Sequence, residues 1–303
     1  MTGERSYSSP AAFRQALTDE LRVLAKESKW SLEQLQRQIA YDRLLERLYL
    51  TADDWIVKGA TALLARDLSV RGSIDIDVYR NLSREAAEAD LRAAARKDIG
   101  DWFRFELEGT RPSSDGSTGV RIPVTAYTGA TPWASFHVDV SGDELRMTGQ
   151  PEHVPPLARV TLPDFSQHGY RAYPLVDHVA DKIVATVQRY GSTRLPSTRY
   201  KDLVDLVAIV TGASVAADAQ IKALISEAER RNVRLPASFD VPDRSLWESG
   251  YAAEARRSLL ETAGTLDEAL AVVRPFVDPL LDGSARGIWD QTTGRWTPSS
   301  EVD

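Results

Sequence analysis

The chain has 303 residues, of which 43% are hydrophobic and 27% charged, as in a globular protein large enough for one large or two ordinary domains. It contains no cysteine, which excludes disulfides, thiolate catalysis and cysteine-based zinc sites. We see neither an apolar leader nor an apolar run of membrane-spanning length, and therefore expect a cytoplasmic protein. Because the net charge is −7, a nucleic-acid partner would have to meet a local basic patch.

Residues 1–50 predict two amphipathic helices. Ser9-Pro10 is a typical helix start, and apolar residues follow it at helical spacing. Residues 31–34 have the pattern of a capping box, which opens the second helix. We expect the pair to pack on the layer that follows; a partner-binding role is the alternative.

Residues 51–170 predict an α/β layer. A strand at 55–57, a turn at Lys58-Gly59 and a helix over 60–67 lead to a second strand at 74–78. A helix over 83–97 follows, and then strand-like runs at 102–108, 120–126, 134–140 and 159–162. We expect a mixed sheet of about five strands with helices before and after it.

From residue 174 onward the pattern is helical. The predicted helices cover residues 175–190, 198–210, 215–231, 252–263 and 266–281. Residues 282–303 are rich in Gly, Ser and Thr, which predicts a mobile tail. With a boundary near 169–174, the predicted parts are a helical pair (1–50), an α/β core (51–170), a helical domain (171–281) and a tail (282–303).

Asp75 and Asp77 form the first candidate site. Apolar and acidic residues alternate on the strand, so the two carboxylates share one face, with roughly 6–7 Å between their Cα atoms. That spacing lets them share a hard divalent ion, without which they would repel each other. Acids on the solvent face of a strand are the alternative. Gly59 favours a ligand site, because it lets the backbone come close to a bound phosphate.

Asp139 is the third acidic candidate. It alternates with Val138 and Val140, on the same side as His137. If its strand pairs beside residues 74–78, it becomes the third carboxylate of a two-metal site for an in-line phosphoryl displacement. An exposed strand acid is the alternative, and the four histidines show no ligand pattern.

Residues 169–201 form a basic segment, which contains six Lys or Arg residues and only two acidic residues. The six are Arg171, Lys182, Arg189, Arg194, Arg199 and Lys201. A triphosphate or a nucleic-acid backbone is the natural partner of such a reversal of charge. Lys182 shares a helix face with His178 and Thr186, although a solvated face is the alternative.

Asp202 and Asp205 stand three residues apart at the start of the next predicted helix. Both can face one cleft. Alternatively, they favour the helix N-terminus electrostatically.

Taken together, these segments resemble the AbiEii family of nucleotidyltransferase toxins, which have the DNA-polymerase-β-like nucleotidyltransferase fold. The matching pieces are Lys58-Gly59-Ala60-Thr61-Ala62-Leu63, Arg71-x-Ser73-x-Asp75-Ile76-Asp77, Asp181-Lys182 and Lys201-Asp202-x-x-Asp205-Leu206. The resemblance covers about residues 50–210. The family's usual second glycine is Ala60 here, a departure that tightens the phosphate turn.

The resemblance implies an α/β nucleotidyltransferase core with a helical C-terminal domain, using an NTP as substrate and Mg²⁺ or Mn²⁺ as cofactor. It implies that Asp75 and Asp77, with Asp139 as the third candidate, hold the metal. The nucleotide would be lined by Lys58, Gly59, Ala60, Thr61, Arg71 and Ser73. Lys182 would neutralise charge on the triphosphate, and Asp202 or Asp205 would complete the catalytic set. A phosphate on Ser73 would repel the substrate and silence the enzyme; a serine that only helps the turn is the alternative.

The resemblance also implies a toxin of a toxin–antitoxin or phage-defence system. Such a toxin adds a pyrimidine nucleotide, from CTP or UTP, to the 3′ acceptor end of tRNA and blocks translation. Its expected partners are that tRNA and a winged-helix, AbiEi-like antitoxin, with no membrane. The acceptor end would contact Arg171, Arg189, Arg194 and Arg199. The alternatives are transfer to a protein hydroxyl or a small molecule, a metal-dependent nuclease, and a non-catalytic partner-binding protein.

Overall fold

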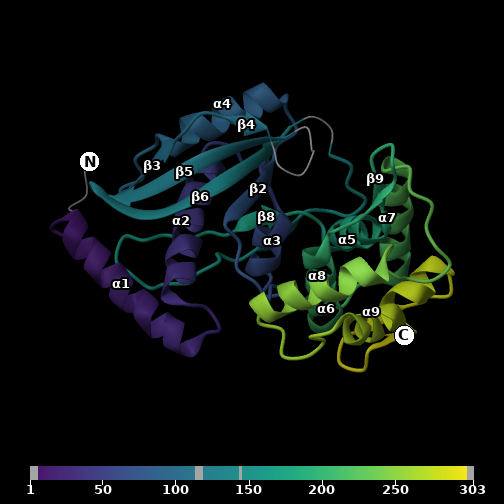
Figure 1. Ribbon diagram of the computed structural model, residues 1–303. Coiled ribbons are helices and arrows are strands. Elements are labelled where there is room, and N and C mark those ends of the chain that lie inside the picture. Colours follow the sequence, from purple (N-terminus) through teal and green to yellow (C-terminus); the bar gives the residue numbers. More distant parts are fainter. Residues whose placement is uncertain (1–5, 113–118, 143–144, 299–303) are drawn as a thin grey trace, which may run out of the picture. The chain divides into compact units, whose positions relative to one another are not determined.

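The computed structural model describes residues 6–112, 119–142 and 145–298 (Figure 1). The chain divides into two compact units. Unit 1 consists of Met1–Arg66, Ser73–Leu145 and Pro151–Ala172. Unit 2 consists of Asp67–Gly72, Arg146–Gln150 and Tyr173–Asp303.

Unit 1 contains a mixed sheet, which confirms the predicted α/β class. Its helices are α1 (Pro10–Glu27), α2 (Leu32–Tyr49), α3 (Gly59–Ala65) and α4 (Arg84–Ala95). Its strands are β1 (Ile56–Lys58), β2 (Asp75–Tyr79), β3 (Phe103–Leu107), β4 (Arg111–Pro112), β5 (Val120–Thr128), β6 (Thr131–Ser141), β7 (Glu152–Val154) and β8 (Tyr170–Ala172). In the described residues the strand order is β3-β5-β6-β2-β1-β8-β7, with β4 paired to β5. The pairs β2–β6 and β1–β8 are parallel, and the other pairs are antiparallel.

The caps of α1 and α2 confirm the predicted helix starts. Ser9 Oγ accepts a hydrogen bond from the Ala12 amide at 3.2 Å, and a proline opens α1. Ser31 and Gln34 form the capping box of α2, because each side chain bonds the other residue's backbone amide. Two of the donors that a helix start leaves unpaired are thereby satisfied in α2.

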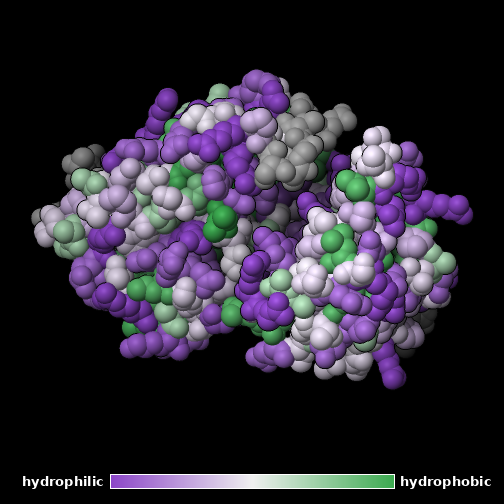
Figure 2. Space-filling view, in the orientation of Figure 1, coloured by the Kyte–Doolittle hydropathy of each residue, from purple (hydrophilic) through white to green (hydrophobic). Residues whose placement is uncertain are grey.

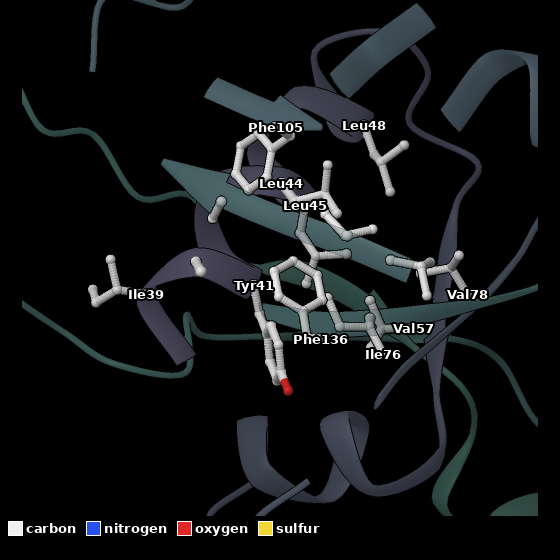
Figure 3. Close-up of a cluster of buried hydrophobic side chains, with 14 of the residues drawn as sticks. Ile39, Tyr41, Leu44, Leu45, Leu48, Val57, Ile76, Val78, Phe105 and Phe136 are labelled. Atoms are coloured by element: carbon white, nitrogen blue, oxygen red, sulfur yellow. The ribbon is translucent and has the colours of Figure 1, made fainter. Parts of the chain in front are cut away.

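The core of unit 1 lies between α2 and one face of the sheet. Figure 3 shows Tyr41, Leu44 and Leu45 of α2 in one cluster with Val78 of the sheet. These side chains are completely buried. The Tyr41 and Phe136 rings meet edge to face, with 4.8 Å between their centroids. Burial of this apolar face leaves the polar side chains of the same strands on the other face.

The sheet is larger than the sequence predicts. The strand expected at residues 159–162 is wrong, since that segment has no regular structure. The loop there is held instead by buried Asp42, whose carboxylate accepts the Leu157 and Ala158 amides at 3.0 and 3.1 Å. The extra strands β4, β7 and β8 have only two or three residues each. Strands of that length are too short to show alternation in a sequence.

Unit 2 is mainly helical, as predicted. It contains α5 (Leu175–Val187), α6 (Tyr200–Gly212), α7 (Ala217–Arg230), α8 (Arg244–Arg257) and α9 (Leu266–Leu281). Two hairpins complete it: β9 (Arg189–Tyr190) with β10 (Leu195–Pro196), and β11 (Ile288–Asp290) with β12 (Arg295–Thr297).

The helix predicted at residues 252–263 is displaced. Helix α8 begins eight residues earlier because Asp243 caps it, accepting the Leu246 amide at 3.2 Å. Trp247 and Tyr251, four residues apart, are completely buried and hold its first turns. The helix ends before Ser258, which is extended.

The mobile tail expected for residues 282–303 is also wrong within the described residues. Trp289 of β11 is 1% exposed, and its indole nitrogen donates to the Val210 carbonyl at 2.8 Å. The Trp289 and Trp296 rings each lie with their centroid 5.1 Å from that of Phe276 in α9. This aromatic cluster holds the β11–β12 hairpin; residues 299–303 lie outside the described part.

The surface is mixed. Figure 2 shows a mostly polar face on which apolar residues occur singly or in small groups. Within residues 6–112, 119–142 and 145–298, no helix combines the length and apolar character needed to span a bilayer.

Candidate active site

A row of charged side chains crosses the polar face of the unit 1 sheet. Lys58 of β1 pairs with Asp77 of β2, which pairs with Asp139 of β6, which pairs with Arg121 of β5. Residues directly opposite each other on neighbouring strands share a face, so two acids lie between two cations. One position along, the row on the other face is apolar: Val57, Val78, Val140 and Val120. The strand pairing that the sequence required for Asp139 is therefore present.

Asp75 stands two residues before Asp77 on the same face of β2, and each of its carboxylate oxygens has a hydrogen-bond partner. Its Oδ2 accepts from Arg121 Nη2 at 3.3 Å, and its Oδ1 lies 3.1 Å from His137 Nδ1. Arg121 also binds Asp139 in a bidentate pair, with Nε–Oδ1 at 2.9 Å and Nη2–Oδ2 at 2.6 Å. The hydrogen bond to Asp139, and then the charges of the three acids, raise the pKa of the Arg121 guanidinium.

Sequence reasoning missed Arg121 and left His137 without a role. The available signal was alternation, because Arg121 stands between buried Val120 and Ile122 on a strand. Its partner could not be read from the sequence, since the β5–β6 register is a property of the folded sheet.

Gly59 fixes the position of the Asp77 carboxylate. Its φ is +58°, and a Cβ built on it would lie 1.8 Å from Asp77 Oδ2. Any side chain at this position would therefore displace the carboxylate, so the turn between β1 and α3 and the acid of β2 are fitted to each other.

We expect Gly59→Ala to lower the rate of nucleotide transfer about 100-fold, the size of effect that a 1 Å misplacement of a catalytic group can cause. Gly100→Ala is the matched control: φ there is +81°, but a Cβ would meet nothing within 4 Å. Both variants carry the left-handed strain, and only Gly59→Ala moves Asp77. Transfer rates and thermal unfolding measured side by side separate the two effects. Equal losses in the two variants would contradict the fitted arrangement.

The hydroxyls predicted to line the nucleotide lie on the backbone beside Asp75. Ser73 Oγ donates to the Asp75 carbonyl at 2.8 Å and accepts from its amide at 3.2 Å. Thr61, which is completely buried, donates to the same carbonyl at 3.2 Å. Tyr41 donates its hydroxyl to the Ser73 carbonyl at 2.8 Å. These contacts shape the entry to β2, and the nucleotide-binding role of Ser73 and Thr61 stays a prediction.

Five further predicted site residues belong to unit 2, where they form the Lys182 cluster: Arg71, Lys182, Arg199, Asp202 and Asp205. Lys182 Nζ donates to Asp202 Oδ1 at 3.0 Å and to Asp205 Oδ2 at 2.7 Å. Arg71 binds Asp205 through Nε and Nη2, both at 2.8 Å. Arg199 Nε donates to Asp202 Oδ2 at 2.7 Å. Each acid is thus bound by Lys182 and by one arginine.

Burial sets the electrostatics of this cluster. Lys182 and Asp202 are 5% exposed and Asp205 is 1% exposed. Burial opposes the ionisation of Asp205, but the charges of Lys182 and Arg71 outweigh it and hold the pKa of Asp205 well below its usual range. The pKa of Lys182 is raised because Asp205 and Asp202 outweigh the effect of its burial. The cluster is therefore fully ionised at neutral pH.

The helix face that carries Lys182 points into unit 2. His178, Lys182 and Thr186 are 4%, 5% and 0% exposed, which excludes the solvated face considered from the sequence. Lys182 is not part of a basic surface. Its contact with the triphosphate stays a prediction, and the partners that the structure gives it are Asp202 and Asp205.

The arginines predicted to bind RNA lie in different surroundings. Arg171 belongs to unit 1 and donates to the Asp53 carbonyl at 3.2 Å. Arg189 braces the β9–β10 hairpin, donating to the carbonyls of Arg194 and Pro242 at 3.3 and 2.6 Å. Arg194 is exposed at the turn of this hairpin. Arg199 belongs to the Lys182 cluster.

The donor set of unit 1 fits a hard divalent ion. Among the described residues, no group of three or more His, Cys, Asp or Glu side chains is arranged to hold a metal. Mg²⁺, however, is commonly held by one or two carboxylates and completes its shell with phosphate oxygens and water. Asp75 and Asp77 meet that requirement. The role of Asp139 as a third ligand stays a prediction, and both of its oxygens accept hydrogen bonds from Arg121.

A family model described as "Nucleotidyl transferase AbiEii toxin, Type IV TA system" matches residues 43–272, well over half of the chain. The chain belongs to the AbiEii family. It is a nucleotidyltransferase of the toxin–antitoxin class, as the resemblance in the sequence predicts. The matched segment includes every predicted site residue of both units.

Solved structures similar to this AbiEii protein include two bacterial proteins. MenT4, a nucleotidyltransferase toxin of Mycobacterium tuberculosis H37Rv, is 15% identical; the match covers 85% of this chain and 99% of MenT4, with a TM-score of 0.49. JHP933 of Helicobacter pylori is 15% identical, with 81% and 94% covered and a TM-score of 0.46. None of the curated proteins compared with the chain matches it.

Proposed function

We propose that this toxin transfers a nucleoside monophosphate from CTP or UTP to the 3′ acceptor end of tRNA in a Mg²⁺-dependent reaction that blocks translation. Membership of the AbiEii family supports nucleotidyl transfer by a toxin. The observation that carries the metal assignment is the acid pair of β2, with the Asp77 carboxylate fitted against Gly59. The tRNA acceptor and the pyrimidine preference rest on the family resemblance.

In unit 1, Asp75 and Asp77 would hold the metal. When bound, the ion supplies Lewis-acid polarisation of the phosphate and neutralises charge on the leaving group. Lys58 stands opposite Asp77 on the same face of the sheet, where it can contact a phosphate oxygen. The Gly59-Ala60 turn and Ser73 would line the nucleotide beside it. Transfer then needs positioning and electrostatic stabilisation rather than a covalent intermediate on the enzyme.

In unit 2, we assign the predicted phosphate contact to the Lys182 cluster as a whole. Three cations and two anions leave it with one net positive charge. Lys182 holds Asp202 and Asp205, and these acids orient Arg71 and Arg199. Arg199 is 46% exposed and Arg71 is 20% exposed, so their guanidinium groups are the part of the cluster that can reach an anionic ligand.

Nucleotide labelling tests this function. The full-length protein is incubated with Mg²⁺, tRNA and each labelled NTP in turn, beside Asp75→Ala. Label in tRNA that requires CTP or UTP supports the proposal. Label in protein or in a small molecule would move the acceptor to the alternative class, and shortened RNA would indicate a nuclease. No label with any NTP would overturn the proposed reaction.

We expect Arg194→Glu to weaken tRNA binding about tenfold, because a phosphate contact becomes a repulsion, and to leave NTP binding unchanged. Arg257→Glu is the matched control. Arg257 is 75% exposed and is the last residue of α8. The hairpin residue Arg189 bonds the Pro242 carbonyl, which precedes the first residue of that helix, so Arg257 stands at the helix end away from this contact. Electrophoretic mobility shifts at two salt concentrations measure the effect. Equal tRNA affinity for the wild type and Arg194→Glu would show that Arg194 of the β9–β10 hairpin does not contact the tRNA.

The family description places the protein in a type IV toxin–antitoxin system. We propose a winged-helix, AbiEi-like antitoxin as its partner, acting in the cytoplasm and in phage defence. Restored growth on co-expression of such a protein, if a neighbouring gene encodes one, would support this pairing, and continued growth arrest would count against it.

A further inference from the structure

Arg121 binds Asp139, the carboxylate that the sequence predicts as the third metal ligand. Its guanidinium binds Asp139 through two parallel hydrogen bonds and reaches Asp75 at 3.3 Å. The side chain is 23% exposed, and Asp139 and Asp75 are 16% and 28% exposed. The two carboxylates are therefore bridged by a partly buried cation that belongs to the chain.

A guanidinium in this position excludes a second metal ion. It stays protonated at any pH at which the protein is folded, and its planar fork matches both Asp139 oxygens. A divalent ion between Asp139 and Asp75 would have to displace it or lie a few ångströms from a fixed positive charge, where repulsion is strong. Asp75 itself is not blocked, because a carboxylate has about four lone-pair positions and can accept these bonds while binding a metal.

We propose that Arg121 is a positioning residue that replaces a second metal ion. Asp139 serves to orient Arg121, Arg121 and His137 orient Asp75, and the carboxylates of the chain hold a single divalent ion at Asp75 and Asp77. This inference rests on the metal assignment in the proposed function. It changes the role predicted for Asp139 from metal ligand to partner of Arg121, in the way that ligating carboxylates are commonly oriented by hydrogen bonds.

Titration of the full-length protein with Mn²⁺ alone, with free Mn²⁺ followed by electron paramagnetic resonance, tests this without any substrate. The wild type is expected to bind a single Mn²⁺ ion, and Asp75→Asn is expected to abolish this binding. Arg121→Met releases Asp139 and Asp75 from their cation, so we expect binding of a further ion or an affinity about tenfold higher. Arg121→Lys keeps the positive charge without the planar fork, and it should therefore still exclude the further ion.

Asp139→Asn decides between the two roles of this acid. The proposal expects it to keep the ion of the wild type, and it expects Arg121→Met with Asp139→Asn to lose the gain seen in Arg121→Met alone. If Asp139→Asn abolishes binding as Asp75→Asn does, or if Arg121→Met binds Mn²⁺ as the wild type does, the inference is overturned while the metal site stands. If neither the wild type nor Arg121→Met binds Mn²⁺, the metal assignment fails as well. Thermal unfolding measurements show whether each variant is folded. If Arg121→Met does not fold, the result for Asp139→Asn still decides whether Asp139 is a metal ligand.

Discussion

Asp77→Asn is expected to lower the rate of nucleotide transfer about 1000-fold or more, because it removes a metal ligand and its negative charge from the centre of the site. The same loss is expected for Asp75→Asn. Toxicity on induced expression should disappear in both variants. Transfer of labelled nucleotide under single-turnover conditions is the measurement.

Stability separates this effect from misfolding. Asp75 and Asp77 stand on one face of β2, and an amide in place of Asp77 removes the repulsion between them while Asp75 keeps its bonds to Arg121 and His137. We therefore expect Asp77→Asn to have a melting temperature equal to that of the wild type or higher, together with lost activity. A lower melting temperature in step with the activity would instead indicate a structural role.

Asp53→Asn provides the matched control, since it makes the same chemical change at an exposed position of unit 1. It should retain the activity of the wild type. Since both acids bind one ion, the double variant Asp75→Asn with Asp77→Asn should be about as slow as each single variant. Transfer within about tenfold of the wild type in Asp77→Asn would show that the pair is not the metal site.

The acid pair shows what a local pattern can predict. Alternation on a strand of five residues was enough to put Asp75 and Asp77 on one face, because side-chain direction depends only on the parity of the position. The caps at Ser9 and Ser31 were equally predictable, since a cap is a contact between residues close in sequence.

Long-range contacts were not predictable in the same way. The bond from Arg121 to Asp139 depends on the register of β5 and β6. Lys182 bonds Asp205, which also binds Arg71, a residue 134 positions earlier in the chain. A lysine beside a histidine and a threonine reads as a polar helix face until those partners are known. The mobile tail was predicted for residues 282–303 from their content of Gly, Ser and Thr. Composition does not show that Trp289 and Trp296 pack together and hold the β11–β12 hairpin.

Asp205→Asn is expected to lower the free energy of unfolding of unit 2 by about 3–5 kcal/mol at pH 7, the range found when one partner of a buried ion pair is removed. The change leaves Lys182 with Asp202 alone and takes the carboxylate from the bidentate pair with Arg71. Urea unfolding, with hydrogen exchange over α5 and α6, measures the loss in the unit that contains the cluster.

Glu229→Gln is the matched control for the removal of a carboxylate charge. Glu229 pairs with Arg146 in the same unit at 3.4 Å, but the two side chains are 64% and 50% exposed. Exposed pairs contribute about 0–1 kcal/mol, so this variant should stay within that range. Equal losses in Asp205→Asn and Glu229→Gln would mean that the Lys182 cluster contributes nothing beyond a surface pair.

The pH dependence follows from the direction of the pKa shift. The pKa of Asp205 is lower in the folded than in the unfolded protein, where a carboxyl of this type titrates near 3.9. The stability it contributes is therefore complete above about pH 5 and is lost as the pH falls below the unfolded-state value. Asn cannot titrate, so the difference in stability between the wild type and Asp205→Asn should shrink as the solution is made acidic. A difference that stays constant down to the acid transition would show that packing, and not the charge of Asp205, stabilises the cluster.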